Sequence, residues 1–233
     1  MNFPFPPPPQ PFVPISDSAD AFPVHRIYCV GRNYEDHARE MGASGREAPF
    51  FFCKPADAVL YAGSAPIVIP YPDRTADLQH EVELVVAIGS PGYRVTVEQA
   101  ARMIWGGAVG IDLTRRDLQA EAKRLGRPWE VGKAFERSAP VGAIRPAADL
   151  GSLGKRRIWL SVNGTIRQDG DLSRMIWSVE ETISQLSGLF ELAAGDLIFT
   201  GTPAGVGPLV PGDRIEAGID GIGIIQARIG DRT

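Results

Sequence analysis

The prediction of the fold starts from one stretch, His80-Glu81-Val82-Glu83-Leu84-Val85-Val86-Ala87-Ile88, which is the clearest long strand in the sequence. Apolar residues at positions 82, 84 and 86 alternate with Glu81 and Glu83, and successive side chains of a strand point to opposite faces of its sheet. The pattern predicts a strand that buries one face and carries both carboxylates on the other, about 7 Å apart at the backbone.

The sequence on either side of this strand predicts more sheet than helix. Capping boxes formed by Thr96 with Gln99 and by Ser178 with Glu181 predict helices that run to about residues 105 and 189. The pairs Asn163-Gly164 and Asp220-Gly221 favour the tight turns of β-hairpins. Other strands are expected at 26–30, 108–113, 158–162, 165–168, 197–200, 214–219 and 222–229, and other helices at 115–125 and from Asn33 to before Gly42.

Composition also indicates a sheet-rich domain. Glycine and proline contribute 26 and 20 of the 233 residues, which is above average usage, indicates many turns and short strands, and excludes a helical bundle. A chain of this length, with 44% hydrophobic residues, buries a sizeable core without disulfides. We predict an α+β, sheet-dominated fold with short helices, in a single domain over residues 25–233.

The N-terminal segment differs in composition from the rest. Residues 1–14 contain seven prolines, so we expect an extended, polyproline-like arm outside the core, assigned to residues 1–24. Such an arm either docks into an aromatic groove of a partner or simply lies on its own subunit or stays disordered, and the second interpretation is favoured.

Charge and cysteine content exclude several classes of protein. A formal net charge of −4 without a dense Lys/Arg block argues against a nucleic-acid or membrane-binding surface. Cys29 and Cys53 are the two cysteines, too few for a disulfide framework or a cysteine-based zinc site. No apolar stretch approaches the roughly 20 residues that span a bilayer, and the N-terminus lacks the features of a signal peptide. We expect a cytoplasmic protein without export or a membrane anchor.

Three carboxylates form the strongest candidate site. Glu81 and Glu83 on one strand face repel each other unless a cation joins them, and Asp112 ends an apolar strand where a carboxylate is out of place. Three carboxylates with water favour Mg²⁺, Mn²⁺ or Ca²⁺ over zinc. The alternatives stay open: the two glutamates pair with Lys or Arg on a solvated face, and Asp112 caps the following helix.

Two further sets of residues suggest chemistry. His37 and Glu40 lie three apart on the expected helix, where the carboxylate can orient the imidazole as a general base, although an isolated surface pair is the simpler interpretation. Lys54 and Lys133 each follow an apolar segment and either bind an anionic substrate or form salt bridges. Dinucleotide, phosphate-loop, zinc-protease and serine-hydrolase motifs are absent from the sequence, which leaves metal-assisted chemistry as the enzymatic option.

Six motifs, in this order, resemble the fumarylacetoacetate hydrolase family over about residues 25–229. They are residues 28–34 (Tyr-Cys-Val-Gly-Arg-Asn-Tyr), the His37 to Glu40 segment, 52–55 (Phe-Cys-Lys-Pro), 80–84 (His-Glu-Val-Glu-Leu), 112–117 (Asp-Leu-Thr-Arg-Arg-Asp) and 201–207 (Gly-Thr-Pro-Ala-Gly-Val-Gly). Within the family the chain is most similar to the short bacterial fumarylpyruvate hydrolases and acylpyruvases, and it lacks the folded N-terminal domain of fumarylacetoacetase.

The resemblance implies a fold, a cofactor and a set of site residues. It implies a mixed β-roll, usually a homodimer, with Mg²⁺ or Mn²⁺, or Ca²⁺ as a substitute, held by Glu81, Glu83 and Asp112. His37 and Glu40 would belong to a lid helix that closes over the substrate. The residues that match family positions lining the substrate pocket are Lys133, Arg116, Gln119 and Thr202, together with Lys54.

The resemblance also implies a reaction. The expected activity is hydrolysis of the carbon–carbon bond of an acylpyruvate, most simply fumarylpyruvate to fumarate and pyruvate, as in the catabolism of aromatic compounds. His37, oriented by Glu40, would activate water, and Lys133 or Gln119 would stabilise the oxyanion. Arg116 or Arg32 would bind the far carboxylate of the substrate, since a guanidinium binds carboxylates in a planar fork.

Two rival functions follow from the same sequence. The first keeps the metal site but decarboxylates oxaloacetate or isomerises a 2-hydroxymuconate-type substrate, and the presence of both His37 and Glu40 favours hydrolysis over it. The second is a non-catalytic scaffold that docks partners through the proline-rich arm. Removal of the arm, with assays of partner binding and turnover, separates the scaffold from the enzyme.

Overall fold

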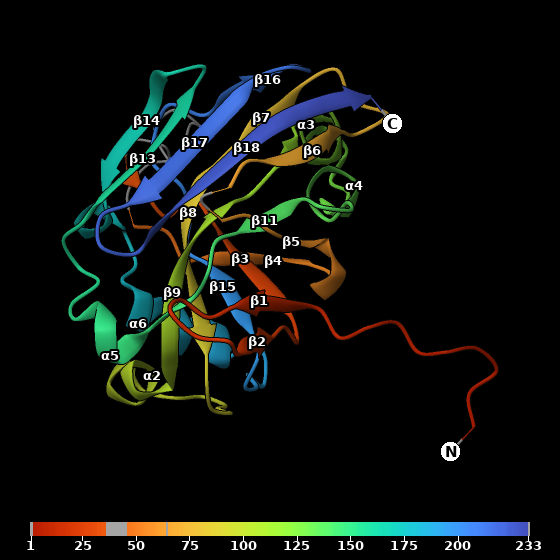
Figure 1. Cartoon of the computed structure of the whole chain (residues 1–233). Coiled ribbons are helices and arrows are strands. Elements are labelled where there is room, and N and C mark those ends of the chain that lie inside the picture. Colours follow the sequence, from red (N-terminus) through yellow and green to blue (C-terminus); the bar gives the residue numbers. More distant parts are fainter. Residues whose placement is uncertain (1, 36–45, 64, 233) are drawn as a thin grey trace.

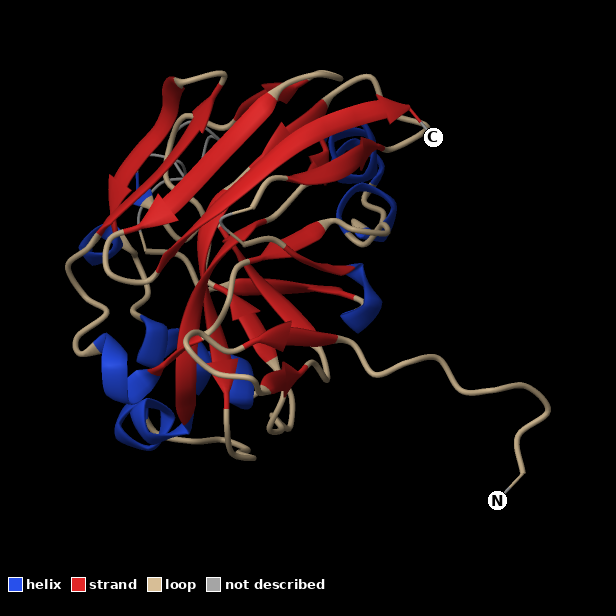
Figure 2. Cartoon of the chain, in the orientation of Figure 1, coloured by secondary structure: helices blue, strands red, loops and turns tan. Residues whose placement is uncertain are grey.

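The computed structural model describes residues 2–35, 46–63 and 65–232. Strands dominate it and short helices lie at its periphery, as Figure 2 shows. Two sheets form most of the molecule: one is the upper layer in Figure 1 and the other curls beneath it. Both contain parallel and antiparallel pairs. The expected sheet-dominated, mixed β-roll is therefore confirmed.

The larger sheet holds the strand from which the sequence analysis started. Its order is β4-β3-β15-β8-β9-β11-β5, with β12 beside β9. Its strands are β3 (Ile27–Gly31), β4 (Phe50–Lys54), β5 (Val59–Tyr61), β8 (Val82–Ile88), β9 (Ile104–Ile111), β11 (Ala139–Val141), β12 (Arg145–Pro146) and β15 (Leu197–Phe199). The predicted long strand is interrupted at Glu81, because β7 (Leu78–His80) pairs instead with β10 (Thr114–Arg115) and β16 (Gly207–Leu209).

The second sheet contains both predicted hairpins and runs in the order β14-β13-β17-β18-β6. Its strands are β6 (Ile67–Tyr71), β13 (Arg157–Val162), β14 (Thr165–Asp171), β17 (Arg214–Ile219) and β18 (Gly223–Arg232). Asn163 and Gly164 have φ of 52° and 78°, as a type I′ turn requires. The Asn-Gly signal therefore located this hairpin correctly.

The two helices with predicted capping boxes, α2 and α6, begin where those signals place them. They are α2 (Val97–Met103), α3 (Arg116–Leu125), α4 (Glu130–Lys133), α5 (Ala147–Leu150) and α6 (Val179–Ser187), with 3₁₀ turns η1 (Ala56–Ala58) and η2 (Leu172–Arg174). Thr96 and Ser178 both form complete capping boxes. Gly126, at φ 64°, ends α3 in the left-handed conformation. The expected helix after Asn33 falls on residues 36–45, outside the described residues.

The apolar core has two parts because the larger sheet is covered on both faces. Between the sheets, Leu84 of β8 belongs to the same buried cluster as Leu160 of β13 and Ile225 of β18. On the opposite face, Val85 and Phe199 belong to a second cluster. All of β8 is buried as a result. The alternative that the sequence left open, in which the two glutamates lie on a solvated strand face, is therefore wrong.

The N-terminal segment is only partly the free arm that the sequence predicts. Residues 2–10 are exposed and trail away from the body in Figure 1. Beyond them, β1 (Phe12–Pro14) and β2 (Ala21–Pro23) form a hairpin whose Val13 and Phe22 are buried in the second cluster. The high proline content obscured this hairpin, in which alternation places Val13 inward and Phe12 outward.

Candidate functional site

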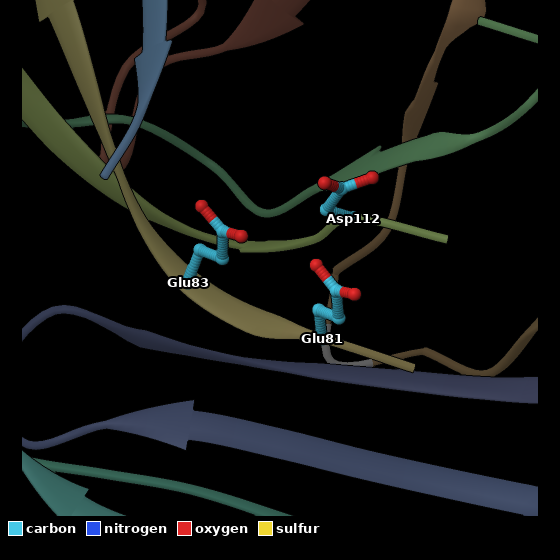
Figure 3. Close-up of side chains that lie close together, drawn as sticks. All are labelled: Glu81, Glu83 and Asp112. Carbon is cyan, nitrogen blue, oxygen red and sulfur yellow. The ribbon is translucent and has the colours of Figure 1, made fainter. Parts of the chain in front are cut away.

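Pairing of β8 with β9 brings the three predicted carboxylates together. Glu83 lies opposite Gly110 in this pair, and the chain continues past β9 so that the Asp112 amide donates to the Glu81 carbonyl at 2.8 Å. Figure 3 shows the carboxylates of Glu81, Glu83 and Asp112 turned toward one shared space. One oxygen from each lies within 4.8 Å of the others.

Basic side chains meet two of these buried carboxylates. Lys133 Nζ, at the end of α4, lies 2.9 Å from Glu81 Oε2 and 2.6 Å from Asp112 Oδ2. Arg116, at the start of α3, donates to Glu81 Oε1. Lys54 Nζ lies 2.8 Å from Asp112 Oδ1. The pairing with Lys and Arg that the sequence left open does occur, but in the interior instead of on a solvated face.

Glu83 is the least compensated of the three. Its Oε2 accepts a 2.6 Å hydrogen bond from the Gly201 amide, and within residues 2–35, 46–63 and 65–232 no basic side chain forms an ion pair with it. Burial, followed by the charges of Asp112 and Glu81, raises the pKa of Glu83 well above its usual range. A divalent cation among the carboxylates would relieve this repulsion, and oxygen-only donors suit hard cations. The residues present therefore fit a divalent metal site.

A small cavity of about 30 Å³ adjoins the carboxylates. Of the predicted residues, it is lined by Glu81, Glu83, Arg32, Arg116, Gln119, Lys133 and Thr202. Lys54 does not line it: its ammonium donates to the carbonyls of Leu113 and Lys133, behind Asp112. A volume of this size holds water or a cation. A larger substrate requires the side chains at the rim to move.

Hydrogen bonds hold the polar lining in place. Arg116 donates to Gln79 and to Gln119, both at 2.7 Å. Thr202 donates to the Val82 carbonyl at 2.7 Å and accepts from Gln168 Nε2 at 2.8 Å. These bonds fix the guanidinium relative to β7 and α3, and the hydroxyl group relative to β8.

Lys133 is held in its charged form. Burial lowers the pKa of a lysine, but the carboxylates of Asp112 and Glu81 outweigh this effect and raise the pKa of Lys133 above its ordinary value. Its buried ammonium is thus a fixed positive charge at the edge of the cavity.

Several residues of the site escaped sequence analysis. Phe50, Phe52, Trp129 and Lys123 also line the cavity, and Gln168 supports it from β14 by bonding His80, the Val82 amide and Thr202. A Trp directly after Pro128 is a visible signal for a rigid aromatic wall. The positions of Lys123 and Gln168 had no comparable signal. His37 and Glu40 lie outside the described residues.

The sequence of the chain settles its family. Residues 26–230 match the family model described as Fumarylacetoacetate (FAA) hydrolase C-terminal. The chain belongs to the fumarylacetoacetate hydrolase family. The predicted membership is thereby confirmed, and a catalytic role for the chain is consistent with the buried carboxylates that the fold assembles.

Three relatives show the range of activities around the chain. The crystal structure of fumarylpyruvate hydrolase from Pseudomonas aeruginosa in complex with Mn²⁺ and pyruvate shares 49% identity and a TM-score of 0.97, covering 99% of this chain and 100% of that one. Oxaloacetate tautomerase FAHD1, mitochondrial, of Mus musculus is 44% identical over 84% of this chain and 87% of its own length. Oxaloacetate decarboxylase, mitochondrial, of Dictyostelium discoideum is 40% identical over 84% and 89%.

Proposed function

We propose that this enzyme of the fumarylacetoacetate hydrolase family hydrolyses the carbon–carbon bond of an acylpyruvate, with fumarylpyruvate giving fumarate and pyruvate. The observation that carries the proposal is the buried set of Glu81, Glu83 and Asp112, of which Glu81 and Glu83 line one cavity together with Lys133. The similarity to a fumarylpyruvate hydrolase over the whole chain supports this substrate.

The three carboxylates would hold the metal, which we propose to be Mg²⁺ or Mn²⁺, with Ca²⁺ as a possible substitute. Such an ion supplies charge neutralisation and polarises the oxygens of a bound keto acid. Glu83 has the strongest need for this charge, because Lys133, Lys54 and Arg116 all contact the other two carboxylates.

The chain's own polar groups would bind and orient the substrate. Lys133 offers a buried ammonium that can stabilise an oxyanion as water adds to the acyl carbonyl. Gln119, fixed by Arg116, can donate its amide to the same oxygen or to the pyruvyl group. As the carbon–carbon bond breaks, the acyl group leaves as a carboxylate and the pyruvyl carbon takes a proton. We propose His37, oriented by Glu40, as the base that activates the water.

A second activity shares these groups. Oxaloacetate decarboxylation or tautomerisation, or isomerisation of a 2-hydroxymuconate, requires a carboxylate-bound metal and a fixed cation but no activated water. The relatives from Mus musculus and Dictyostelium discoideum carry names of this kind. Oxaloacetate is therefore the competing substrate to test.

The decisive experiment follows the ultraviolet absorbance of fumarylpyruvate with purified protein in Mg²⁺, Mn²⁺ or EDTA. We expect metal-dependent decay that is lost in Glu83→Gln and retained in Glu121→Gln, a control at an exposed position of α3. No decay with either metal, combined with turnover of oxaloacetate, would replace the hydrolase assignment with the second activity. Retention of full activity in Glu83→Gln would overturn the proposed site.

Assembly and location are further proposals. We propose a homodimer, which light scattering of the purified chain tests, and a cytoplasmic enzyme of aromatic catabolism, which cell fractionation and growth on aromatic substrates test. Cys29 is buried and Cys53 exposed, and neither forms a disulfide. In the described ranges, no helix is long and apolar enough to cross a membrane.

A further inference from the structure

Two cations of the cavity are not used by acidic side chains. Arg116 and Lys133 bind the carboxylates of Glu81 and Asp112. Arg32 and Lys123 also line the cavity, yet neither forms an ion pair with an acidic group in the part of the chain that the structure describes. The cavity therefore contains two positive charges that can still accept an anion.

Both cations rest on one aromatic wall. Lys123 Nζ lies 4.7 Å from the centre of the Trp129 ring, and Arg32 Cζ lies 5.8 Å from that of Phe50. The Phe50 and Trp129 rings are themselves in edge contact, with their centres 5.4 Å apart at 89°. Since the rings touch, the wall holds the two cations on adjoining surfaces, and within the described residues it leaves their donors without an anionic partner.

The conformation and burial of Arg32 cost free energy, and a ligand that accepts a hydrogen bond from its guanidinium would offset part of this cost. Arg32 has φ of 58°, a conformation that is uncommon for a residue with a side chain. Among residues 2–35, 46–63 and 65–232, its buried Nε has no hydrogen-bond partner, which leaves a desolvated donor unsatisfied. A carboxylate accepts two parallel hydrogen bonds from a guanidinium and would satisfy this donor.

The positive charges around Lys123 also favour a bound anion. Burial, followed by the charges of Arg116 and Arg32, lowers the pKa of Lys123 to about 8. The positive charges at this wall thus oppose one another, and an anion between Arg32 and Lys123 would stabilise both.

We propose that Arg32 and Lys123 form a carboxylate-binding subsite, lined by Phe50 and Trp129, that receives the far carboxylate of a dicarboxylic substrate. This inference rests on the proposed function and deepens it, because it makes the enzyme selective for dicarboxylic acylpyruvates over acetylpyruvate. Arg116, which the sequence offered as an alternative for this carboxylate, is already bonded to Gln79, Glu81 and Gln119.

The test compares two substrates and two products in the Mn²⁺-loaded enzyme. Lys123→Met keeps the length of the side chain and removes its charge, Lys123→Arg keeps the charge, and Arg124→Met removes a neighbouring exposed cation of α3 as a matched control. We measure kcat/KM for fumarylpyruvate and for acetylpyruvate, and the affinities for fumarate and pyruvate by calorimetry.

In Lys123→Met we expect the ratio of the two kcat/KM values to fall about 10-fold or more, as the loss of one charged hydrogen bond predicts. Fumarate affinity should fall with it while pyruvate affinity stays within two-fold. Lys123→Arg should restore most of the ratio, and Arg124→Met should leave it unchanged.

Different results would overturn the subsite and the proposed function. A wild type that hydrolyses both acylpyruvates, with the ratio and the fumarate affinity unchanged in Lys123→Met, overturns the subsite alone. A wild type that hydrolyses neither overturns the proposed function, and the subsite then stands or falls on whether Lys123→Met weakens fumarate binding.

Discussion

The ammonium group of Lys133 lies 2.6 Å from Oδ2 of Asp112, within the same group of carboxylates that fits a divalent cation. Lys133 and a metal ion held by these carboxylates would therefore share the negative charge of Asp112. The lysine lowers the repulsion among the carboxylates and would also compete with the metal for their charge.

Lys133→Met should separate these two effects. We expect Mn²⁺ to bind more tightly, because a positive charge is removed, while turnover falls by about 100-fold or more through loss of the oxyanion donor. Without metal, the free energy of unfolding should drop by about 3–5 kcal/mol, since the variant leaves buried carboxylates less compensated. Calorimetric titration with Mn²⁺ and steady-state kinetics check these values. Weaker metal binding in the variant would contradict the competition.

Glu83→Gln should weaken Mn²⁺ binding, whereas Lys133→Met should strengthen it. Replacement of one of three carboxylates by a neutral amide is expected to reduce Mn²⁺ affinity by about 100-fold, at the upper end of the loss caused by changing a residue that only supports a ligand. In the metal-free protein, burial and the neighbouring carboxylates oppose the charge of Glu83 and raise its pKa, so a neutral amide at this position should leave the melting temperature unchanged or higher. Thermal unfolding with EDTA and with Mn²⁺ measures both effects. A clearly lower melting temperature in EDTA would contradict the repulsion among the three carboxylates.

Deletion of residues 2–9 should leave stability and turnover nearly unchanged, because these residues are exposed. Val13→Asp, by contrast, places a charge in the second core cluster and should destabilise the fold by several kcal/mol. Chemical denaturation compares the two variants. If the deletion removed partner binding, and neither form turned over any substrate, the scaffold function would gain support.

Asp117 should make stability depend on pH in the acid range. Its carboxylate accepts hydrogen bonds from Thr75 Oγ1 and from the amides of Ala76 and Leu118. Although partial burial raises the pKa of Asp117, these bonds outweigh burial and lower it below the ordinary value. The stabilisation is therefore fully present above the unfolded-state pKa of about 4 and is lost as the pH falls through the folded-state pKa.

The variant Asp117→Asn should accordingly unfold about 1–2 kcal/mol more easily at pH 7. The difference from wild type should shrink below pH 4, as measured by urea denaturation over a pH series. The exposed Asp149→Asn is the control. A pH-independent difference would contradict the role of the charge.

Lys123 should make fumarate binding depend on pH in the alkaline range. With a pKa of about 8, the ammonium is charged at pH 7 and mostly neutral at pH 9. Fumarate affinity should then fall by about ten-fold between pH 7 and pH 9. This fall is in addition to any change from the other charged groups around Lys123, which are Arg32, Arg116, Glu81 and Lys133. Calorimetry measures the change, and Lys123→Arg, which stays charged, should remove it. An equal loss in both proteins would contradict the assignment to Lys123.

The sequence predicted the elements that depend on local chemistry. The capping boxes at Thr96 and Ser178, the Asn163-Gly164 turn and the Gly126 helix end all formed as expected. Each is a contact between residues a few positions apart, so its signal is contained in a short stretch of sequence. The Val13 hairpin was missed because the prolines around it obscured its alternation, and because its stabilisation comes from packing on the distant larger sheet.

For the site, the sequence by itself determined the three carboxylates, since Glu81 and Glu83 lie two apart on one chain segment and Asp112 interrupts an apolar run. Only the tertiary structure decided that they are buried and that Lys133 and Arg116 meet Glu81. It also decided that, in the part of the chain the structure describes, Arg32 and Lys123 line the same cavity without an acidic partner. Burial and charge pairing depend on segments far apart in the sequence. The sequence specifies which chemical groups are present. The packing of β8, β9, α3 and α4 determines which of these groups are neighbours and how their pKa values shift.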